Sequence, residues 1–160
     1  MTGLGDMMDN GLVSAFAEAT QSTFRDMFGL DAVLDGTHEL SRSDDHGWEL
    51  TGLIGLAGAM HGVVAVRLSG ELVSRLLAGS GVQASSDAER RQLEGGLVGE
   101  LSNIIAGAAA TSGKLDFEIA PPVVVRGPNH KIGWPSIAPV VALEFRLGGA
   151  NFEVDVCVKD

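Results

Sequence analysis

The chain has 160 residues, of which 45% are apolar and 20% are charged, so it is long enough for one domain with its own core and has a globular composition. Eleven basic residues against 21 acidic ones give a net charge of −10, which argues against a nucleic acid or an anionic membrane as the partner. No apolar run reaches the roughly 18 residues that span a bilayer. The start lacks the basic segment of a secretory signal, so we expect a cytoplasmic protein.

The first part of the chain predicts a helix. Residues 1–8 are expected to form a flexible N-terminus, and residues 9–160 a single domain. From Asp9 onward, apolar residues recur at helical spacing. Asp9 or Asn10 is suited to cap the start of this helix, and Gly29 is suited to its end.

A β-hairpin and a short helix are predicted next. Residues 31–46 are mixed and polar, which indicates one short strand and a loop. The runs WELTGLIGLAGAM and HGVVAVRLSG are rich in β-formers and divided by small residues, as in a hairpin. A short helix is expected over about 70–78, after Ser69.

The second half predicts a long helix and a closing hairpin. Ser86 stands three residues before Glu89, which is the spacing of a capping box, and the helix is expected to end at Gly113. FEIAPPVVVRG is expected to be extended because of its two prolines. Apolar residues alternate over 141–158 around Gly148 and Gly149, as in a hairpin. The order of elements predicts an α+β fold with long helices on a largely antiparallel sheet.

The long helix carries two different faces. At 100° per residue, a buried stripe is predicted that consists of Leu93, Leu97, Leu101, Ile104 and Ala108. A second stripe lies roughly 100° away, and Gly99 flanks it. This second stripe consists of Gly96, Glu100, Asn103, Gly107 and Ala110.

The glycines of this helix need an explanation, because each costs about 0.8–1 kcal/mol relative to alanine. Small residues allow another surface to approach the backbone closely. One interpretation is that a partner docks against Gly96, Gly99 and Gly107 while Glu100 and Asn103 reach into it. The alternative is that the glycines admit the other long helix of the same fold.

The helix motif GELSNIIAGAA, followed by IAPPVVVRG and the closing hairpin, resembles the CheX branch of the CheC/CheX/FliY chemotaxis phosphatases. GLIGLAGAMHGVVAVRLS is similar to the upstream hairpin of that family, and the likeness covers about residues 10–158. The resemblance implies the CheC-like two-layer fold.

The family signature is an acidic residue or serine, then Glu, then Asn, with a proline downstream. Glu100 and Asn103 match its centre, and Pro121 or Pro122 matches the proline. Gly96 stands where the acidic residue or serine is expected, which is a departure from the pattern. A weak internal echo places Ala15 and Glu18 of the first helix on Glu100 and Asn103, so one centre per subunit is expected.

The resemblance implies dephosphorylation of a CheY-like response regulator at its aspartyl phosphate. Asn103 would position the attacking water, and Glu100 would pair with the lysine of the receiver. The receiver would supply its own Mg²⁺, so no cofactor of the chain's own is expected. A homodimer paired through sheet edges is also implied. The alternative is a non-catalytic adaptor on the same fold, which binds a response regulator or works like a motor-switch protein.

No metal site is predicted from the sequence. The four histidines, His38, His46, His61 and His130, lack the spacing of a metal-binding motif.

Overall fold

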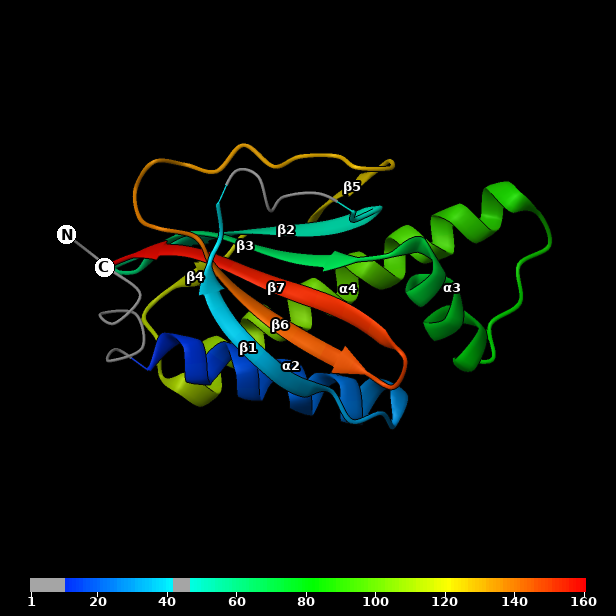
Figure 1. The fold of residues 1–160 in the computed structure, drawn as a ribbon, viewed down its shortest axis with the longest axis horizontal. Helices are drawn as coiled ribbons and strands as arrows, with labels where there is room; N and C mark the ends of the chain where they lie inside the picture. The colour runs from blue at the N-terminus through cyan, green and yellow to red at the C-terminus, as the bar shows by residue number, and fades with distance from the viewer. Residues whose placement is uncertain (1–10, 42–46) are drawn as a thin grey trace.

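Seven strands form one sheet, and two long helices lie on one of its faces (Figure 1). The computed structural model describes residues 11–41 and 47–160. Within them, the helices are α2 (Leu12–Phe28), α3 (Gly70–Gly79) and α4 (Asp87–Gly113). The strands are β1 (Val33–Glu39), β2 (Leu50–Ala57), β3 (His61–Leu68), β4 (Glu118–Ile119), β5 (Val123–Arg126), β6 (Val141–Leu147) and β7 (Ala150–Lys159).

The sheet is antiparallel throughout and has the strand order β1-β6-β7-β3-β2-β4, with β5 also paired to β2. Both predicted hairpins are confirmed, because β2 pairs with β3 and β6 pairs with β7. Leu147 lies opposite Ala150 across the Gly148 turn. The predicted α+β fold, with long helices on an antiparallel sheet, is therefore confirmed.

The first helix ends as predicted. Gly29 adopts a left-handed conformation with φ of 66°, and its N–H donates to the carbonyl of Arg25. Such a conformation suits glycine because it has no Cβ. The predicted caps Asp9 and Asn10, like the flexible segment 1–8, lie outside the described residues. Gly11 precedes the helix and provides no side-chain cap.

Serine side chains cap the other two helices. Ser69 Oγ accepts from the N–H of Leu72, and Ser86 Oγ accepts from the N–H of Glu89 at 3.1 Å. The Glu89 carboxylate accepts from Ser85 Oγ at 2.6 Å, so its partner is the serine that precedes the capping residue Ser86. None of the described helices is both long and apolar enough to cross a bilayer.

The core lies between the sheet and the two long helices. Phe152 of β7 stacks on Phe24 of α2 at 4.5 Å and on Phe145 of β6 at 5.1 Å between ring centroids. Every second residue of β7 faces the opposite, outer side of the sheet. There, Cys157 is buried and its Sγ lies 3.4 Å from the carbonyl oxygen of Ala138, so the chain after β5 covers this strand.

Candidate functional site

Glu100 and Asn103 lie on the solvent-facing side of α4. Both are exposed, as is Gly96 one turn earlier. Because they stand three residues apart on a helix, the two side chains project from adjacent turns of one face. Among the described residues, neither side chain has a hydrogen-bond or ion-pair partner. The helix thus presents an amide and a carboxylate that are free to meet another molecule.

The predicted buried stripe of α4 is largely wrong. Ile104 is 36% exposed, and Leu93, Leu97 and Ala108 are only partly buried. The observed buried face is rotated by roughly 120° and consists of Glu94, Val98, Gly99, Leu101, Ser102, Ile105, Ala106 and Ala109. Its centre lies roughly 150° from the midpoint of Glu100 and Asn103, so the pair points away from the core. The spacing of the leucines did not predict the buried face correctly, because other parts of the chain pack against more than one side of α4.

The three glycines assigned to partner contact have different surroundings. Gly96 is exposed, and a Cβ on it would meet nothing within 4 Å. Gly99 is buried, and a Cβ on it would lie 3.4 Å from Val124 Cγ2. Gly107 is partly buried beside Ile119. Gly99 therefore serves packing inside the chain, against β5, which corrects the expectation that it forms part of an open docking face.

The segment that joins β4 to β5 borders the exposed pair. A Cβ on Gly99 would lie 3.7 Å from Pro122 Cγ, and Gly99 precedes Asn103 by one helical turn. Both Pro121 and Pro122 are exposed. Of the two prolines considered for the downstream position, Pro122 is the one placed against α4.

A glycine in the sheet sets how closely α4 approaches it. A Cβ on Gly52 of β2 would overlap the side chain of Ser102 and stand 3.1 Å from the carbonyl oxygen of Val98. Ser102 is fully buried, and its Oγ donates to that same carbonyl at 2.7 Å. Gly52 and Ser102 thereby fix the height of the helix above the sheet, and with it the position of Asn103.

The N-terminal half of α4 is anchored by a buried acid that the sequence analysis missed. Glu94 is 5% exposed and accepts from Ser74 Oγ of α3 at 2.8 Å. It also pairs with the Arg126 guanidinium of β5 at 3.4 Å. The Glu94 carboxylate occupies a position where an amphipathic helix normally has an apolar residue. This departure from the pattern is the sequence signal that could have identified Glu94 as a buried acid.

The first helix does not provide a second centre. Ala15, which the internal echo aligns with Glu100, is buried, and a Cβ on Gly113 of α4 would approach its Cβ to 2.7 Å. Glu18 is exposed but has no matching carboxylate partner at position 15. α2 also approaches α4 closely at Gly113, the predicted end of the helix, which is not one of the glycines considered for contact with the other long helix.

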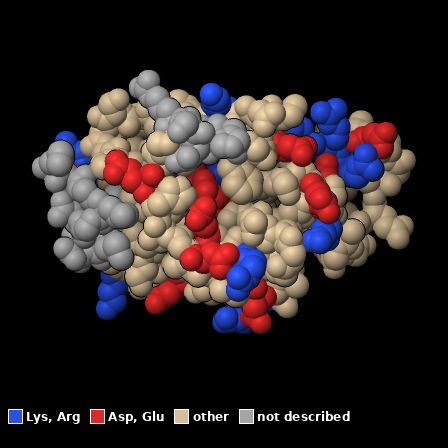
Figure 2. All heavy atoms as spheres, viewed as in Figure 1, with Lys and Arg blue, Asp and Glu red and all other residues tan. Residues whose placement is uncertain are grey.

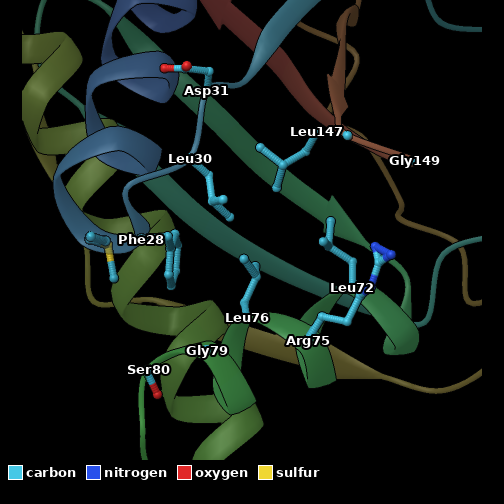
Figure 3. Close-up of a pocket in the computed structure, with 12 residues that line it drawn as sticks. Phe28, Leu30, Asp31, Leu72, Arg75, Leu76, Gly79, Ser80, Leu147 and Gly149 are labelled. Carbon is cyan, nitrogen blue, oxygen red and sulfur yellow. The ribbon is translucent and has the colours of Figure 1, made fainter.

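The cavity with the greatest volume among those described lies away from the exposed pair. It has a volume of about 580 Å³ and opens between the end of α2, helix α3 and the β6–β7 turn (Figure 3). Apolar side chains such as Phe28, Leu72 and Leu76 line it together with Arg75. Glu100 and Asn103 do not line this cavity. The pair therefore stands on a projecting helix face, which suits recognition of a macromolecule better than enclosure of a small ligand.

Comparison with known proteins adds the family. The family described as "Chemotaxis phosphatase CheX" matches residues 50–146, a range that contains both α4 and the β4–β5 segment. No curated protein matches the chain.

Solved structures agree with this fold. The chemotaxis protein CheX from Vibrio vulnificus is 22% identical, with a TM-score of 0.80, and the match covers 92% of this chain and 99% of that one. The CheX–CheY–BeF3–Mg complex from Borrelia burgdorferi is 23% identical, with a TM-score of 0.75 and coverage of 92% and 97%. FliY from Thermotoga maritima is 18% identical, with a TM-score of 0.71 and coverage of 98% and 91%. Since the family match extends over more than half of the sequence, this chain belongs to the CheX family of chemotaxis phosphatases.

Proposed function

We propose that this protein dephosphorylates the aspartyl phosphate of a CheY-like response regulator, with one centre at Glu100 and Asn103. The observation that carries the proposal is the exposed, partnerless pair on the face of α4 that points away from the core, in a chain of the CheX family. A neighbour of the same fold, from Borrelia burgdorferi, was crystallised with CheY, BeF3 and Mg. Such a partner would place this protein in the cytoplasm.

The reaction requires few catalytic groups from the phosphatase itself. An aspartyl phosphate is an activated acyl phosphate, and its hydrolysis proceeds through a loose, metaphosphate-like transition state that depends mainly on positioning and electrostatics. The receiver domain would supply the Mg²⁺ and a lysine. This chain then needs to place one water in line with the phosphorus and hold the two proteins in register.

Asn103 is the residue proposed to position the water. Its carboxamide can accept one hydrogen bond from the water and donate another toward the phosphoryl group. An asparagine needs no particular protonation state for this task. Because its side chain has no partner among the described residues, docking would not have to break a bond within the chain.

Glu100 is proposed to fix the docked geometry. Its carboxylate can form a charge-assisted hydrogen bond with a cationic side chain of the receiver. The open space over Gly96 leaves the approach to this turn unobstructed. Pro122 borders the other side of the turn and would limit the directions from which the receiver can enter.

The test compares Asn103→Ala with the unmodified chain in the decay of ³²P-labelled CheY-type receiver. The receiver should come from the same organism. We expect wild type to accelerate decay and Asn103→Ala to lose about 100-fold of that acceleration, the order of effect that a mispositioned reactant produces. Gln92→Ala is the matched control, since Gln92 is exposed on the same helix about three turns earlier. Equal acceleration by wild type and Asn103→Ala would contradict the proposed role.

A non-catalytic adaptor is the second candidate, and Gly96 is the observation that favours it. The position lacks the acidic residue or serine of the family pattern. An adaptor would bind the phosphorylated receiver without changing its decay. Failure of wild type to accelerate decay, with binding retained, would therefore support the adaptor.

The homodimer remains a prediction. The sheet ends at β1 on one side and at β4 and β5 on the other. β1 carries a register shift between Leu34 and Gly36, a feature that discourages simple edge pairing. The opposite edge, at β4 and β5, is consequently the one we expect to pair. Light scattering coupled to size-exclusion chromatography would distinguish one copy from two.

A further inference from the structure

Three metal-ligating side chains meet on the outer face of the sheet, opposite the helices. They are His38 of β1, Glu144 of β6 and Glu153 of β7, and their ligand atoms all lie within 4.8 Å of one another. His38 Nδ1 is 3.7 Å from Glu144 Oε2. Acidic side chains gather near the middle of this face of the molecule (Figure 2). No sequence motif links these residues, because His38 lies more than 100 residues before Glu144 and Glu153.

Strand pairing holds the three residues in place. Glu144 and Glu153 are directly opposite in the β6–β7 ladder, and Gly36 is opposite Glu144 in the β1–β6 ladder. His38 follows Gly36 by two residues and so lies diagonally from Glu144 on the same face. Ligands on three neighbouring strands are better pre-organised than ligands on loops.

The charges of the cluster favour a bound cation. Like charges directly opposite in an antiparallel pair destabilise the sheet. Glu153 is only 6% exposed, and Asp155, two residues further along β7, is fully buried and paired with the buried Arg67 at 3.3 Å. Asp155 Oδ1 is buried and has no hydrogen-bond partner among the described residues. The cation nearest in the ladder, Arg67, stands opposite Glu153 on β3, whereas Arg146 on β6 pairs with Asp35 at 3.2 Å.

We propose that His38, Glu144 and Glu153 bind one divalent transition-metal ion of the zinc class. Imidazole and carboxylate ligands bind zinc at about 2.0–2.2 Å, which places tetrahedral ligand atoms roughly 3.4 Å apart. The 3.7 Å between His38 and Glu144 is close to that value. A cavity of about 250 Å³, lined by Asp35, Glu144 and Glu153 among others, leaves space for a water ligand.

The ligand set also predicts selectivity. One imidazole nitrogen with two carboxylates suits zinc, iron or nickel, whereas magnesium and calcium prefer ligand sets made of oxygen. Zn²⁺ should therefore bind more tightly than Mg²⁺. The competing explanation is that His38 and Glu144 simply contact each other within the chain, which requires no metal.

The experiment is calorimetric titration of the chelator-treated protein with Zn²⁺, and separately with Mg²⁺. We expect one Zn²⁺ per chain, and affinity lower by about tenfold or more in His38→Asn and in Glu144→Gln. Their side chains are 37% and 54% exposed, so both replacements preserve core packing. His61→Asn and Glu39→Gln are matched controls, because His61 of β3 and Glu39 of β1 are exposed and neither residue belongs to the cluster.

A second readout is the midpoint temperature of thermal unfolding. Zn²⁺ should raise this temperature in wild type and in the controls but not in His38→Asn. Zinc binding of equal affinity in His38→Asn and wild type would overturn the proposal. So would absence of zinc binding by wild type. Because the cluster lies on the opposite face of the sheet from Asn103, neither outcome bears on the proposed phosphatase.

Discussion

Gly99 of α4 packs against Pro122, and a Cβ on this glycine would stand 3.7 Å from the proline Cγ. The contact places the β4–β5 segment beside the helical turn that carries Glu100 and Asn103. The helix face is therefore bounded on one side by the chain itself and open on the other, over Gly96. This asymmetry defines the direction from which a receiver would approach.

Side chains of increasing size at position 99 should separate helix propensity from packing. A Cβ there meets only ordinary contacts, the nearest at 3.4 Å from Val124 Cγ2, so Gly99→Ala should raise the free energy of unfolding by up to about 1 kcal/mol. Gly99→Leu should lower it by about 1–3 kcal/mol through overpacking. Urea unfolding measures both. Gly96→Leu is the control, and a loss of stability in that variant would contradict the open space seen there.

Restoring the family pattern at position 96 should increase activity. Gly96 has room for a side chain, so Gly96→Asp and Gly96→Ser should fold and accelerate receiver dephosphorylation relative to wild type. Gly96→Ala should add about 0.8–1 kcal/mol of helix stability without that gain. The rate of dephosphorylation of the receiver and the free energy of urea unfolding, measured on the same three variants, test this prediction. If Ala raises the rate as much as Asp and Ser, helix stability is responsible and the restored side chain is not.

Glu100→Gln should weaken docking more than it slows the bound reaction. Removal of the charge takes away a charge-assisted contact worth about 1.5–3 kcal/mol, or roughly tenfold to a hundredfold in affinity for the receiver. Titration against BeF3-activated receiver measures this loss, and the salt dependence of binding should fall as well. Asn103→Ala should retain affinity. Equal affinities of Glu100→Gln and wild type would remove Glu100 from the interface.

Asp155 should make stability depend on pH. Burial and the neighbouring Glu153 raise the pKa of Asp155 well above its ordinary value of 3.8, and the Arg67 guanidinium opposes them only in part. The folded chain thus holds this proton more tightly than the unfolded chain does. The resulting stabilisation is complete below pH 3.8 and is lost as the pH rises through the raised pKa.

Comparison with Asp155→Asn isolates that contribution. The free energy of unfolding of wild type minus that of the variant should decrease as the pH rises above about 4, by at most about 1.4 kcal/mol per pH unit. Urea unfolding at a series of pH values, with a chelator present, measures the difference. A difference that is constant, or that grows, over this range would contradict the assignment.

Much of the fold was predictable because it depends on local signals. Alternating apolar residues around Gly148 predicted the β6–β7 hairpin, and the serine caps at Ser69 and Ser86 predicted where α3 and α4 begin. The exposed pair Glu100 and Asn103 was also predictable, because an i, i+3 spacing puts two side chains on one helix face whatever surrounds the helix. These features are determined within a few turns or strands of the chain.

The tertiary structure decided the features that depend on what packs against each element. The buried face of α4 differs from the leucine stripe because α2, the sheet and the β4–β5 segment all cover parts of the helix. Gly99 proved to be a packing residue, and Glu94 a buried anchor, for the same reason. The cluster of His38, Glu144 and Glu153 exists only because distant strands become neighbours in the sheet. The sequence by itself determined where the helices and strands lie along the chain and that Glu100 and Asn103 share one helix face. Which side chains are buried was decided by packing between distant segments, which local periodicity does not encode.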